Sequence, residues 1–479
     1  MKGKLKAGFT ILAFGIMLFA SAIGSAQTDT RNRLIVITDI GNEPDDSQSM
    51  VRLMLYSNQI DIEGIIASTS VHQKLHVSPE LIQKVIGAYE KVRPNLLKHE
   101  PGFPTAKHLS SLVKSGLPVY GMEGVGAGKD SEGSEWIIKM LEKNDARPLW
   151  VTVWGGPNNL AQALWKLKET KSQEELKSLI GKLRVYTISD QDNSATWIRK
   201  NFKDLFYIVS PGNYDDATWA AMNKPYLGSN KEVISNGWLA KNIQQGHGPL
   251  GAIYADVAFG MEGDTPSWLM LIPNGLNEPE HPNWGSWGGR YELYKPPFNS
   301  KLRWIVPLEE ETRPIWTNAE DDYTPRVEAK WGRAIIKDTM SYKNNHVTIW
   351  RWREDIQNDF AARMTWCNQS FKNANHPPVV KLKTPEKLAI KSGDPFVLDA
   401  SASYDPDGDG LSYHWFQYEE AGTYTGSIII VPENLSVTRQ LKAPQVDSLQ
   451  TIHFIVKVTD KGTPRLTRYK RVIVTVLPQ

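Results

Sequence analysis

Residues 34–46 read LIVITDIGNEPDD. The first five, Leu34–Thr38, are apolar or β-branched and do not alternate with polar residues, which is typical of a parallel strand buried on both faces. Four acids follow at once, and helical spacing of apolar residues then indicates a helix over Asp46–Tyr56. Because ligands bind beyond the carboxyl ends of parallel strands, the loop between this strand and helix is where a functional site is expected.

The same strand-then-helix order recurs through the first 210 residues. Such alternation predicts right-handed crossovers and a mainly parallel sheet with helices on both faces, which is an α/β fold. A helix over Ile349–Met364 is expected to close this domain. The further strands are expected over 60–68, 149–153, 183–188 and 205–210, and the further helices over 79–92, 131–143, 158–167 and 197–202.

Met1–Ala26 has the features of a secretory signal peptide. Three lysines precede an apolar run from Ala7 to Ala20, and small residues end the segment, as at a signal cleavage site. A retained membrane anchor is the alternative, for which the apolar run is short. We expect cleavage near Gln27, no membrane span, and a secreted or periplasmic protein.

The pattern changes after residue 372. Asn373–Val379 reads NANHPPV, which is typical of a linker, and the remaining residues alternate between strand patterns and turns. This predicts an all-β domain like an immunoglobulin sandwich, with Trp415 as its buried tryptophan. We therefore expect a signal peptide over 1–26, an α/β domain over 27–372 and a β-sandwich over 373–479.

Composition excludes several classes of protein. The chain has 479 residues with 55 Lys+Arg against 53 Asp+Glu, and removal of the three lysines in residues 1–26 changes the formal net charge from +2 to −1. A near-neutral chain argues against nucleic acid as the main partner. The single cysteine, Cys367, excludes an intramolecular disulfide and a cysteine zinc site. The 17 tryptophans either fill the core or line a ligand surface.

Asp39, Asp45 and Asp46 crowd the first loop together with Glu43. Like charges this close raise each other's pKa unless a cation or hydrogen-bond donors neutralise them. A hard cation with oxygen ligands, above all Ca²⁺, is the simplest candidate. The alternative is helix capping, because acids at a helix N-terminus interact favourably with its dipole. Capping explains Asp45 or Asp46 well and Asp39 poorly.

At these residues the sequence resembles the nucleoside hydrolases, whose first hydrophobic strand ends in an acidic signature. Residues 154–161, WGGPNNLA, are similar to that family's Gly-Pro-x-x-Asn-Leu-Ala turn, which lends a backbone carbonyl to a calcium ion. Asp264, in the stretch GDTPS, is similar to the late aspartate that completes the calcium site. The resemblance implies Asp39 as the general base. It implies that the metal is held by Asp39, Asp45, Asp46, Asp264 and the Gly155 carbonyl.

Two departures separate the chain from the nucleoside hydrolases. Five residues lie between Asp39 and Asp45, where that family has three, and Gly263 stands where many members have a histidine that helps the base to leave. A closer resemblance covers nearly the whole mature chain. It is to a family of secreted bacterial proteins that join a nucleoside-hydrolase-like domain to an immunoglobulin-like one and are named for a cellulose-binding member. It is carried by ITDIGNEPDD (37–46), YTISDQDNSATWIR (186–199), EGDTPSWLMLIPNGLN (262–277) and WRWREDIQNDFAARM (350–364).

Further residues are candidates for substrate binding. Asp192 and Asn193 follow a predicted strand, at a point where the nucleoside hydrolases hold sugar hydroxyls with an acid/asparagine loop. The alternative is that Asp190 or Asn193 caps the next helix. His72, beyond the second strand, either hydrogen-bonds substrate or is incidental.

Residues 260–294 form a long segment that is rich in Gly, Pro, Trp and Asn. Such a segment inside a folded domain is more often functional than a spacer. We expect Glu262 and Trp268 to contact substrate, and Trp268, Trp284 and Trp287 to suit stacking on a sugar or a base.

A second acidic turn, Asp405-Pro-Asp407-Gly-Asp409, lies in the expected β domain. It resembles the first loop of polycystic-kidney-type immunoglobulin-like domains. Alternating acids of this kind either ligate Ca²⁺ or bond their own backbone in a solvated turn.

The main hypothesis is a secreted glycoside hydrolase, in which calcium-assisted water attacks a glycosidic bond of an extracellular polysaccharide or oligosaccharide with inversion. The alternatives are a non-catalytic carbohydrate-binding protein, a true nucleoside N-ribohydrolase, and an adhesion or scaffold role for the β domain. The retained acids favour catalysis. Export and Gly263, which cannot donate a proton to a base, favour a glycan over a nucleoside. The oligomeric state stays open.

Overall fold

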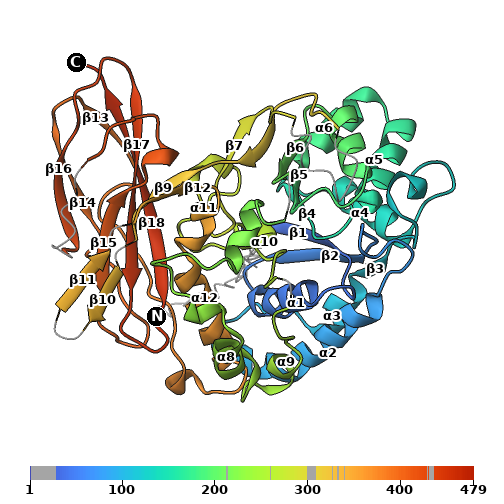
Figure 1. The fold of residues 1–479 in the computed structure, drawn as a ribbon, viewed down its shortest axis with the longest axis horizontal. Helices are drawn as coiled ribbons and strands as arrows, with labels where there is room; N and C mark the ends of the chain where they lie inside the picture. Colours follow the sequence, from blue (N-terminus) through green and yellow to red (C-terminus); the bar gives the residue numbers. More distant parts are fainter. Residues whose placement is uncertain are drawn as a thin grey trace. The chain divides into compact units, whose positions relative to one another are not determined.

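The main sheet has eight strands in the order β3-β2-β1-β4-β5-β6-β8-β7. Neighbours run parallel, except that β7 is antiparallel to β8 at one edge. The chain leaves β1 toward β2 on one side and returns to β4 on the other, so the loop after β1 lies at a switch point of the kind where open sheets bind ligands. In this computed structural model (Figure 1), the strands are β1 Arg33–Thr38, β2 Asp61–Ala67, β3 Val113–Ser115, β4 Leu149–Val153, β5 Leu183–Thr187, β6 Phe206–Val209, β7 Tyr291–Tyr294 and β8 Ile315–Asn318.

The structure describes Met1 and residues 29–211, 214–258, 260–298, 309–325, 327–331, 334–338, 340–428, 430 and 436–479. The expected signal peptide therefore lies outside the described residues. Residues 32–479 form one unit by their contacts. Across the described part of the chain, no helix combines the length and the apolar character that a membrane span requires.

Two buried clusters lie on the two faces of the sheet. Leu34 and Val36 of β1 join one cluster, and Ile35 and Ile37 join the other, because successive side chains of a strand point to opposite faces. The first cluster includes residues of α1, α2, α3, α9, α10, α11 and α12, and the second includes residues of α4 to α7. The helices are α1 Pro44–Tyr56, α2 Pro79–Leu96, α3 Ala106–Ser111, α4 Glu132–Glu142, α5 Asn158–Thr170, α6 Gln173–Lys182, α7 Ser194–Asn201, α8 Asn236–Leu239, α9 Gly248–Ala252, α10 Pro266–Leu269, α11 Val347–Trp350 and α12 Arg353–Thr365.

The predicted fold class is confirmed: a mostly parallel sheet carries helices on both faces, and a strand-rich part follows. The sequence pattern did not show the β7–β8 pair, which extends the sheet beyond β6. The helix expected over Ile349–Met364 is two helices, α11 and α12, and a short break separates them.

The C-terminal part is built from two small sheets. One has the order β13-β18-β17-β15 and the other pairs β14 with β16. Trp415 is buried in the core of this part, as expected for its central tryptophan. The strands are β13 Lys387–Lys391, β14 Pro395–Asp399, β15 Ser412–Gln417, β16 Thr438–Lys442, β17 Gln450–Thr459 and β18 Thr467–Leu477. The remaining strands are β9 Asp321–Tyr323, β10 Val327–Trp331, β11 Ala334–Asp338 and β12 Tyr342–Asn344, which form two short pairs.

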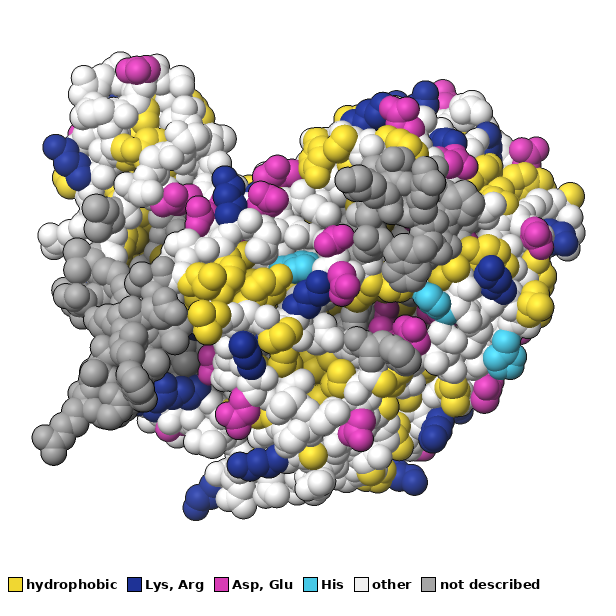
Figure 2. Space-filling model, in the orientation of Figure 1, with side chains coloured by type: hydrophobic (Ala, Val, Ile, Leu, Met, Phe, Trp, Pro, Cys, Tyr) yellow, Lys and Arg dark blue, Asp and Glu magenta, His cyan; other side chains and the backbone are white. Residues whose placement is uncertain are grey.

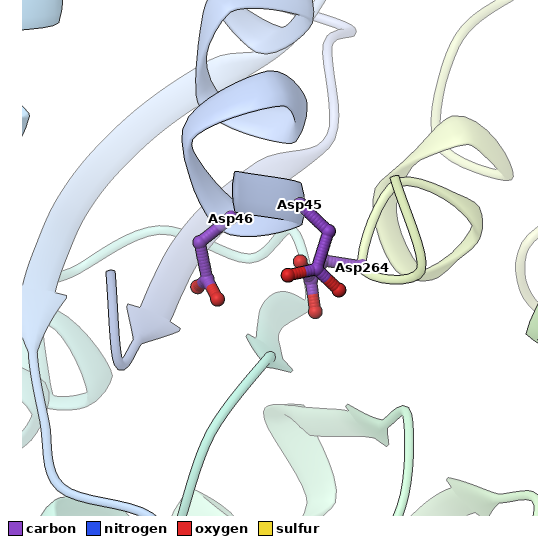
Figure 3. Close-up of side chains that lie close together, drawn as sticks. All are labelled: Asp45, Asp46 and Asp264. Carbon is purple, nitrogen blue, oxygen red and sulfur yellow. The ribbon is translucent and has the colours of Figure 1, made fainter. Parts of the chain in front are cut away.

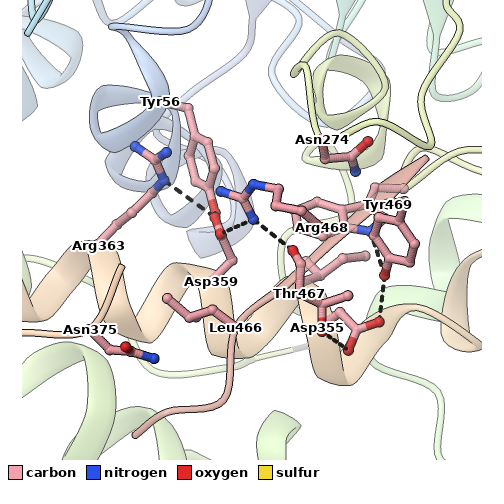
Figure 4. Close-up of polar contacts among 12 residues, drawn as sticks. Tyr56, Asn274, Asp355, Asp359, Arg363, Asn375, Leu466, Thr467, Arg468 and Tyr469 are labelled. Carbon is pink, nitrogen blue, oxygen red and sulfur yellow. Dashed lines mark hydrogen bonds and ion pairs between the residues drawn. The ribbon is translucent and has the colours of Figure 1, made fainter. Parts of the chain in front are cut away.

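The helix α12 lies against β18, and buried ion pairs join the two (Figure 4). Asp359 accepts hydrogen bonds from Arg468 on β18 at 2.7 Å and from Tyr56 on α1 at 2.6 Å. Asp355 lies 2.7 Å from Lys457 and accepts a hydrogen bond from Tyr469. The strand-rich part is therefore linked to α12 by charged contacts whose two carboxylates are buried, whereas the Lys457 side chain is 31% exposed.

Candidate metal centre and cavity

A cavity of about 300 Å³ opens beyond the carboxyl ends of β1 and β4. Its walls come from the loop after β1, the start of α1, residues 214–224 and the turn that carries Asp264. On the face drawn in Figure 2, acidic side chains gather in a recess of the α/β part with a histidine beside them. The lining includes the acids Asp39, Glu43, Asp45, Asp46 and Asp264, the rings of His72, Trp154, Tyr214 and Trp219, and the polar side chains of Asn42, Gln191, Asn223 and Lys224.

Three of the acids come close enough to share one cation. Asp45 and Asp46 project from the first turn of α1 toward the space that Asp264 also faces (Figure 3). One oxygen from each of the three lies within 4.8 Å of the others. The N-cap residue Glu43 makes no side-chain capping bond, and Asp46 instead accepts a hydrogen bond from the Thr38 hydroxyl. The dipole of α1 favours both acids of its first turn, but capping does not explain why Asp264 joins them.

The charge state of the cluster fits an oxygen-ligated cation. Burial, reinforced by the neighbouring carboxylates, raises the pKa of Asp45 to about 7 and those of Asp46 and Asp264 well above the ordinary value. Asp45 Oδ1 and Asp264 Oδ2 are buried without a hydrogen-bond partner. Among the described residues, no lysine or arginine forms an ion pair with these acids, and Lys224 of the same cavity pairs with Asp215. The donors are all carboxylate oxygens, which suits Ca²⁺.

Asp39 lies in the same cavity, against the turn after β4. Burial raises the pKa of Asp39 to about 6, although bonding to Ser70 opposes the shift. A Cβ atom at Gly155 would come within 2.6 Å of Asp39 Oδ1, so only glycine permits this approach. The two positions that the sequence analysis joined in one site are thus adjacent in the fold.

Asp192 and Asn193 have separate positions. Asp192 is fully buried, and its Oδ1 accepts a hydrogen bond from the Ser194 backbone N–H at 2.7 Å, while its Oδ2 has no partner. Burial raises the pKa of Asp192 to about 6. Asn193 is exposed and accepts a hydrogen bond from the Met122 backbone at 2.9 Å. Neither residue lines the cavity, so Asp192 serves the start of α7 and a contact with bound sugar stays a prediction.

Glu262 and Trp268 do not face the cavity, contrary to expectation. Glu262 is fully buried, its Oε2 lies 2.5 Å from Arg52 Nε, and Thr265 donates a hydrogen bond to it at 2.9 Å. Trp268 is fully buried and packs against Tyr56 with 5.6 Å between ring centroids. The reason is that the turn before α10 is folded against α1, where Glu262 pairs with Arg52 and Thr265 bonds Ser49.

The other tryptophans of the 260–294 segment also lie away from the cavity. Trp287 is fully buried, and Trp284 stacks on His281 at 3.8 Å and meets His453 of β17 edge-on. These rings fill the space between the α/β part and the strand-rich part. Composition alone could not distinguish such packing from a sugar-binding wall.

The aromatic wall of the cavity comes instead from residues 214–224. Trp219 packs edge-on against Tyr214, at 5.4 Å between ring centroids, and both line the cavity. A Cβ atom at Gly263 would lie 2.9 Å from the Trp219 ring, so Trp219 occupies the space that a side chain at position 263 would need. His72 is exposed at the cavity, and its Nε2 lies 2.8 Å from the Tyr214 hydroxyl. Sequence reasoning missed Trp219 and Tyr214, because this segment has no motif and no regular spacing.

The acidic turn of the strand-rich part has a different arrangement. Asp405 Oδ1 accepts hydrogen bonds from the backbone N–H groups of Asp407 and Asp409, at 2.9 and 3.1 Å. Asp407 in turn holds His376, through its backbone N–H at 2.7 Å and its Nδ1 at 3.0 Å. These bonds favour the backbone-bonded turn of the two alternatives.

The fold and the carboxylate cluster define a protein of the nucleoside-hydrolase-like class. Residues 33–291 match the family model described as "Cellulose-binding Sde182, nucleoside hydrolase-like domain", and residues 395–476 match "Cellulose-binding protein Sde0182, C-terminal domain". The chain belongs to this cellulose-binding Sde182 family.

Among solved structures, the chain is similar to a nucleoside hydrolase-related hypothetical protein from Saccharophagus degradans that is described as associated with carbohydrate metabolism. The two share 36% identity and a TM-score of 0.78 over 93% of this chain and 100% of that one. The effector protein XOO4466 and the type III effector XopQ, complexed with adenosine diphosphate ribose, each match 60% of this chain at 9% identity. Their TM-scores of 0.33 and 0.28 are too low to support an argument, and among curated proteins none matches.

Proposed function

We propose that the protein is an exported glycoside hydrolase that cleaves a glycosidic bond of an extracellular polysaccharide or oligosaccharide. The observation that carries the proposal is the convergence of four carboxylates on one cavity with aromatic walls: Asp39, Asp46 and Asp264 are buried and Asp45 is half-buried. Carbohydrate binding alone does not require so many unpaired acids in one place, because their burial is unfavourable without a charge to neutralise them.

In this proposal Asp45, Asp46 and Asp264 hold the metal, together with Asp39 and the Gly155 carbonyl. A bound Ca²⁺ supplies positive charge that holds sugar hydroxyls and makes a neighbouring water more acidic. Asp39, which lies in the same cavity, would remove the proton from the attacking water. Direct attack by water inverts the anomeric centre.

The other walls of the cavity would receive the leaving group. The indole of Trp219 offers a flat apolar face, and sugar rings present C–H faces that pack on such surfaces. The His72 ring and the Tyr214 hydroxyl, 2.8 Å apart, offer a proton to the departing oxygen. Because Trp219 fills the space beside Gly263, no proton donor can stand at that position, which favours a sugar over a purine or pyrimidine as leaving group.

A second candidate is carbohydrate binding without catalysis. Both family descriptions name cellulose binding, and one of them adds a likeness to nucleoside hydrolases. In that case the carboxylates would hold a structural cation, and the cavity would bind a chain end without cleaving it.

The test incubates residues 27–479 with Ca²⁺ and two panels, one of plant and algal glycans and one of nucleosides. We expect release of reducing sugar from at least one glycan, and a rate lower by about 10²–10⁴-fold in Asp39→Asn. Asp447→Asn, an exposed acid of the strand-rich part, is the matched control and should keep the full rate. Release of free base from a nucleoside with no sugar released from any glycan would refute the glycan proposal. Glycan binding with no turnover would establish the second candidate.

A further inference from the structure

A second cavity, of about 590 Å³, lies where the α/β part meets the strand-rich part. It shares no lining residue with the acidic cavity. One wall includes His99, which follows α2, and Phe371, which follows α12. The opposite wall includes His376, Pro406 and Lys470 of the C-terminal part. We call it the junction cavity. Its size lies within the usual range for sites that bind small molecules or short segments of a polymer.

An exposed aromatic ring forms part of this cavity. Phe371 is 41% exposed, although it is a large apolar side chain. One face of its ring stacks on His376, with centroids 3.8 Å apart and planes 15° apart, and His376 stacks in turn on the buried Trp366 at 5.1 Å. The result is a layered platform whose outermost ring remains accessible to a ligand. Flat exposed rings of this kind are suited to the apolar face of a pyranose.

Hydrogen bonds hold the middle layer of the platform rigid. His376 Nε2 lies 2.9 Å from His99 Nδ1, and His376 Nδ1 lies 3.0 Å from Asp407. His99 Nε2 lies 3.0 Å from the Gln369 carbonyl. Because both nitrogens of each imidazole are engaged, neither ring can rotate, and the Phe371 ring has a fixed support. A ligand that stacks on it therefore orders little of the protein, which favours binding.

The rim of the junction cavity offers polar groups that sugar hydroxyls can use. The Gln59 amide and the Glu278 carboxylate line the cavity. The cations at the rim are already matched, because Arg468 pairs with Asp359 and Lys470 with Glu386. An anionic ligand thus finds no unmatched charge, whereas a neutral glycan finds one donor, several acceptors and an aromatic face.

We infer that the junction cavity is a second carbohydrate site, which holds a neutral polysaccharide chain while the acidic cavity acts on a glycosidic bond. The inference rests on the proposed function for its choice of a glycan as ligand. It adds a binding site that depends on both parts of the molecule, and it gives the charged contacts between α12 and β18 a functional role.

The test measures binding of residues 27–479 to insoluble cellulose, with bound and free protein separated by sedimentation. Phe371→Ala should weaken binding by about tenfold or more, because the stacking surface is lost. The matched control is Phe298→Ala, since Phe298 is also exposed, at 54%, and does not line either cavity. Gln59→Ala should weaken binding less than Phe371→Ala does. Thermal unfolding of each variant establishes that it is folded.

Wild-type affinity in a folded Phe371→Ala variant, or equal loss in Phe298→Ala, would overturn the inference, as would failure of the unaltered protein to bind cellulose. Binding is measured apart from turnover, so the two proposals can fail separately. If Phe371→Ala loses cellulose but no glycan is cleaved by the unaltered protein, the junction site stands and the hydrolase proposal falls. If small soluble glycosides are cleaved and Phe371→Ala binds cellulose normally, the hydrolase stands and the junction site falls.

Discussion

The pKa values of two buried aspartates, Asp359 and Asp264, are shifted in opposite directions. Asp359, at the junction, is 3.3 Å from Arg363 and 2.7 Å from Arg468, and it accepts a hydrogen bond from Tyr56. Burial alone would raise its pKa, but the two arginines lower it below the ordinary value. Asp264, in the acidic cavity, is equally buried, and its charged neighbours are the carboxylates Asp46, Asp45 and Asp39, so its pKa is raised.

This difference distinguishes buried charges that stabilise the fold from buried charges that need a bound ligand to compensate them. A buried carboxylate is tolerated when a cation on another element neutralises it, as at Asp359. A group of buried carboxylates without such partners destabilises the fold, and it is expected only where a ligand compensates. By this criterion the ion pairs of Asp359 are structural contacts, and the cluster of Asp45, Asp46 and Asp264 is a binding site.

The largest expected effect on stability comes from removing the ion pairs of Asp359. Asp359→Asn removes the charge that Arg363 and Arg468 share. It leaves Arg468 without its ion-pair partner and Arg363 with Glu100 alone, at 3.3 Å. We expect a loss of about 3–5 kcal/mol of stability, measured by urea unfolding at pH 7.

The control is Glu386→Gln, which removes a rim acid whose side chain is 58% exposed and which pairs with Lys470. Its effect should be below about 1 kcal/mol, as for other surface pairs. An Asp359→Asn variant as stable as the unaltered protein would show that the junction contributes little to the fold.

The next largest effect should come from calcium. A Ca²⁺ ion that binds the folded state and not the unfolded state stabilises the protein by about 2.7 kcal/mol when the Ca²⁺ concentration is 100 times the Kd. We expect the melting temperature of the metal-free protein to rise with Ca²⁺ and to fall again with chelator. The response should persist in Asp359→Asn and disappear in Asp46→Asn. A response of equal size in both variants would show that Ca²⁺ binds outside the acidic cavity.

Much of the site could be predicted because its signals are local. Asp39, Asp45 and Asp46 stand within eight residues after one strand, and their crowding is visible in the sequence. Asp264 was found by resemblance, since more than 200 residues separate it from Asp46. Trp219 was missed because only the fold brings its ring against Gly263. Trp268 was assigned to the wrong environment, because hydrophobic composition does not say which side of a turn faces the core.

The fold was predictable for a related reason. Continuous apolar runs such as Leu34–Thr38 specify buried parallel strands, and the register of β1 between β2 and β4 follows from them. The pairs that join the two parts of the molecule could not be found this way. Arg468 and Asp359 are 109 residues apart, and either charge alone is indistinguishable from a solvated one.

The pH dependence should differ between the two regions. In the metal-free protein the pKa of Asp39 is about 6 and that of Asp45 about 7, both above the ordinary 3.8. The folded state therefore binds more protons than the unfolded state between about pH 4 and pH 7, so stability falls as the pH rises through this window. Asp359, with a lowered pKa, contributes stability above about pH 4 that is lost only as the pH falls below it.

Unfolding of metal-free protein at pH 5 and pH 7.5 would measure this dependence. We expect a loss of about 1.4 kcal/mol for Asp39 alone between these values, reversed when Ca²⁺ is present, since the metal binds the ionised carboxylates. Stability that increases with pH in the absence of metal would mean that the cavity acids are ionised and compensated without a cation.

The smallest expected change in stability is that of Asp264→Asn in the acidic cavity, and its sign is opposite to that of Asp359→Asn. Asp264→Asn replaces a buried carboxylate whose Oδ2 has no hydrogen-bond partner with a neutral amide of the same shape. The neutral amide avoids the cost of ionising a buried carboxylate beside Asp45 and Asp46. Without metal at pH 7.5 it should therefore stabilise the fold by about 1 kcal/mol, whereas the same substitution at Asp359 destabilises it. The stabilised variant should no longer respond to Ca²⁺. If Asp264→Asn instead destabilises the metal-free protein, the carboxylate makes a favourable contact of its own, and the two aspartates do not differ in the way their surroundings indicate.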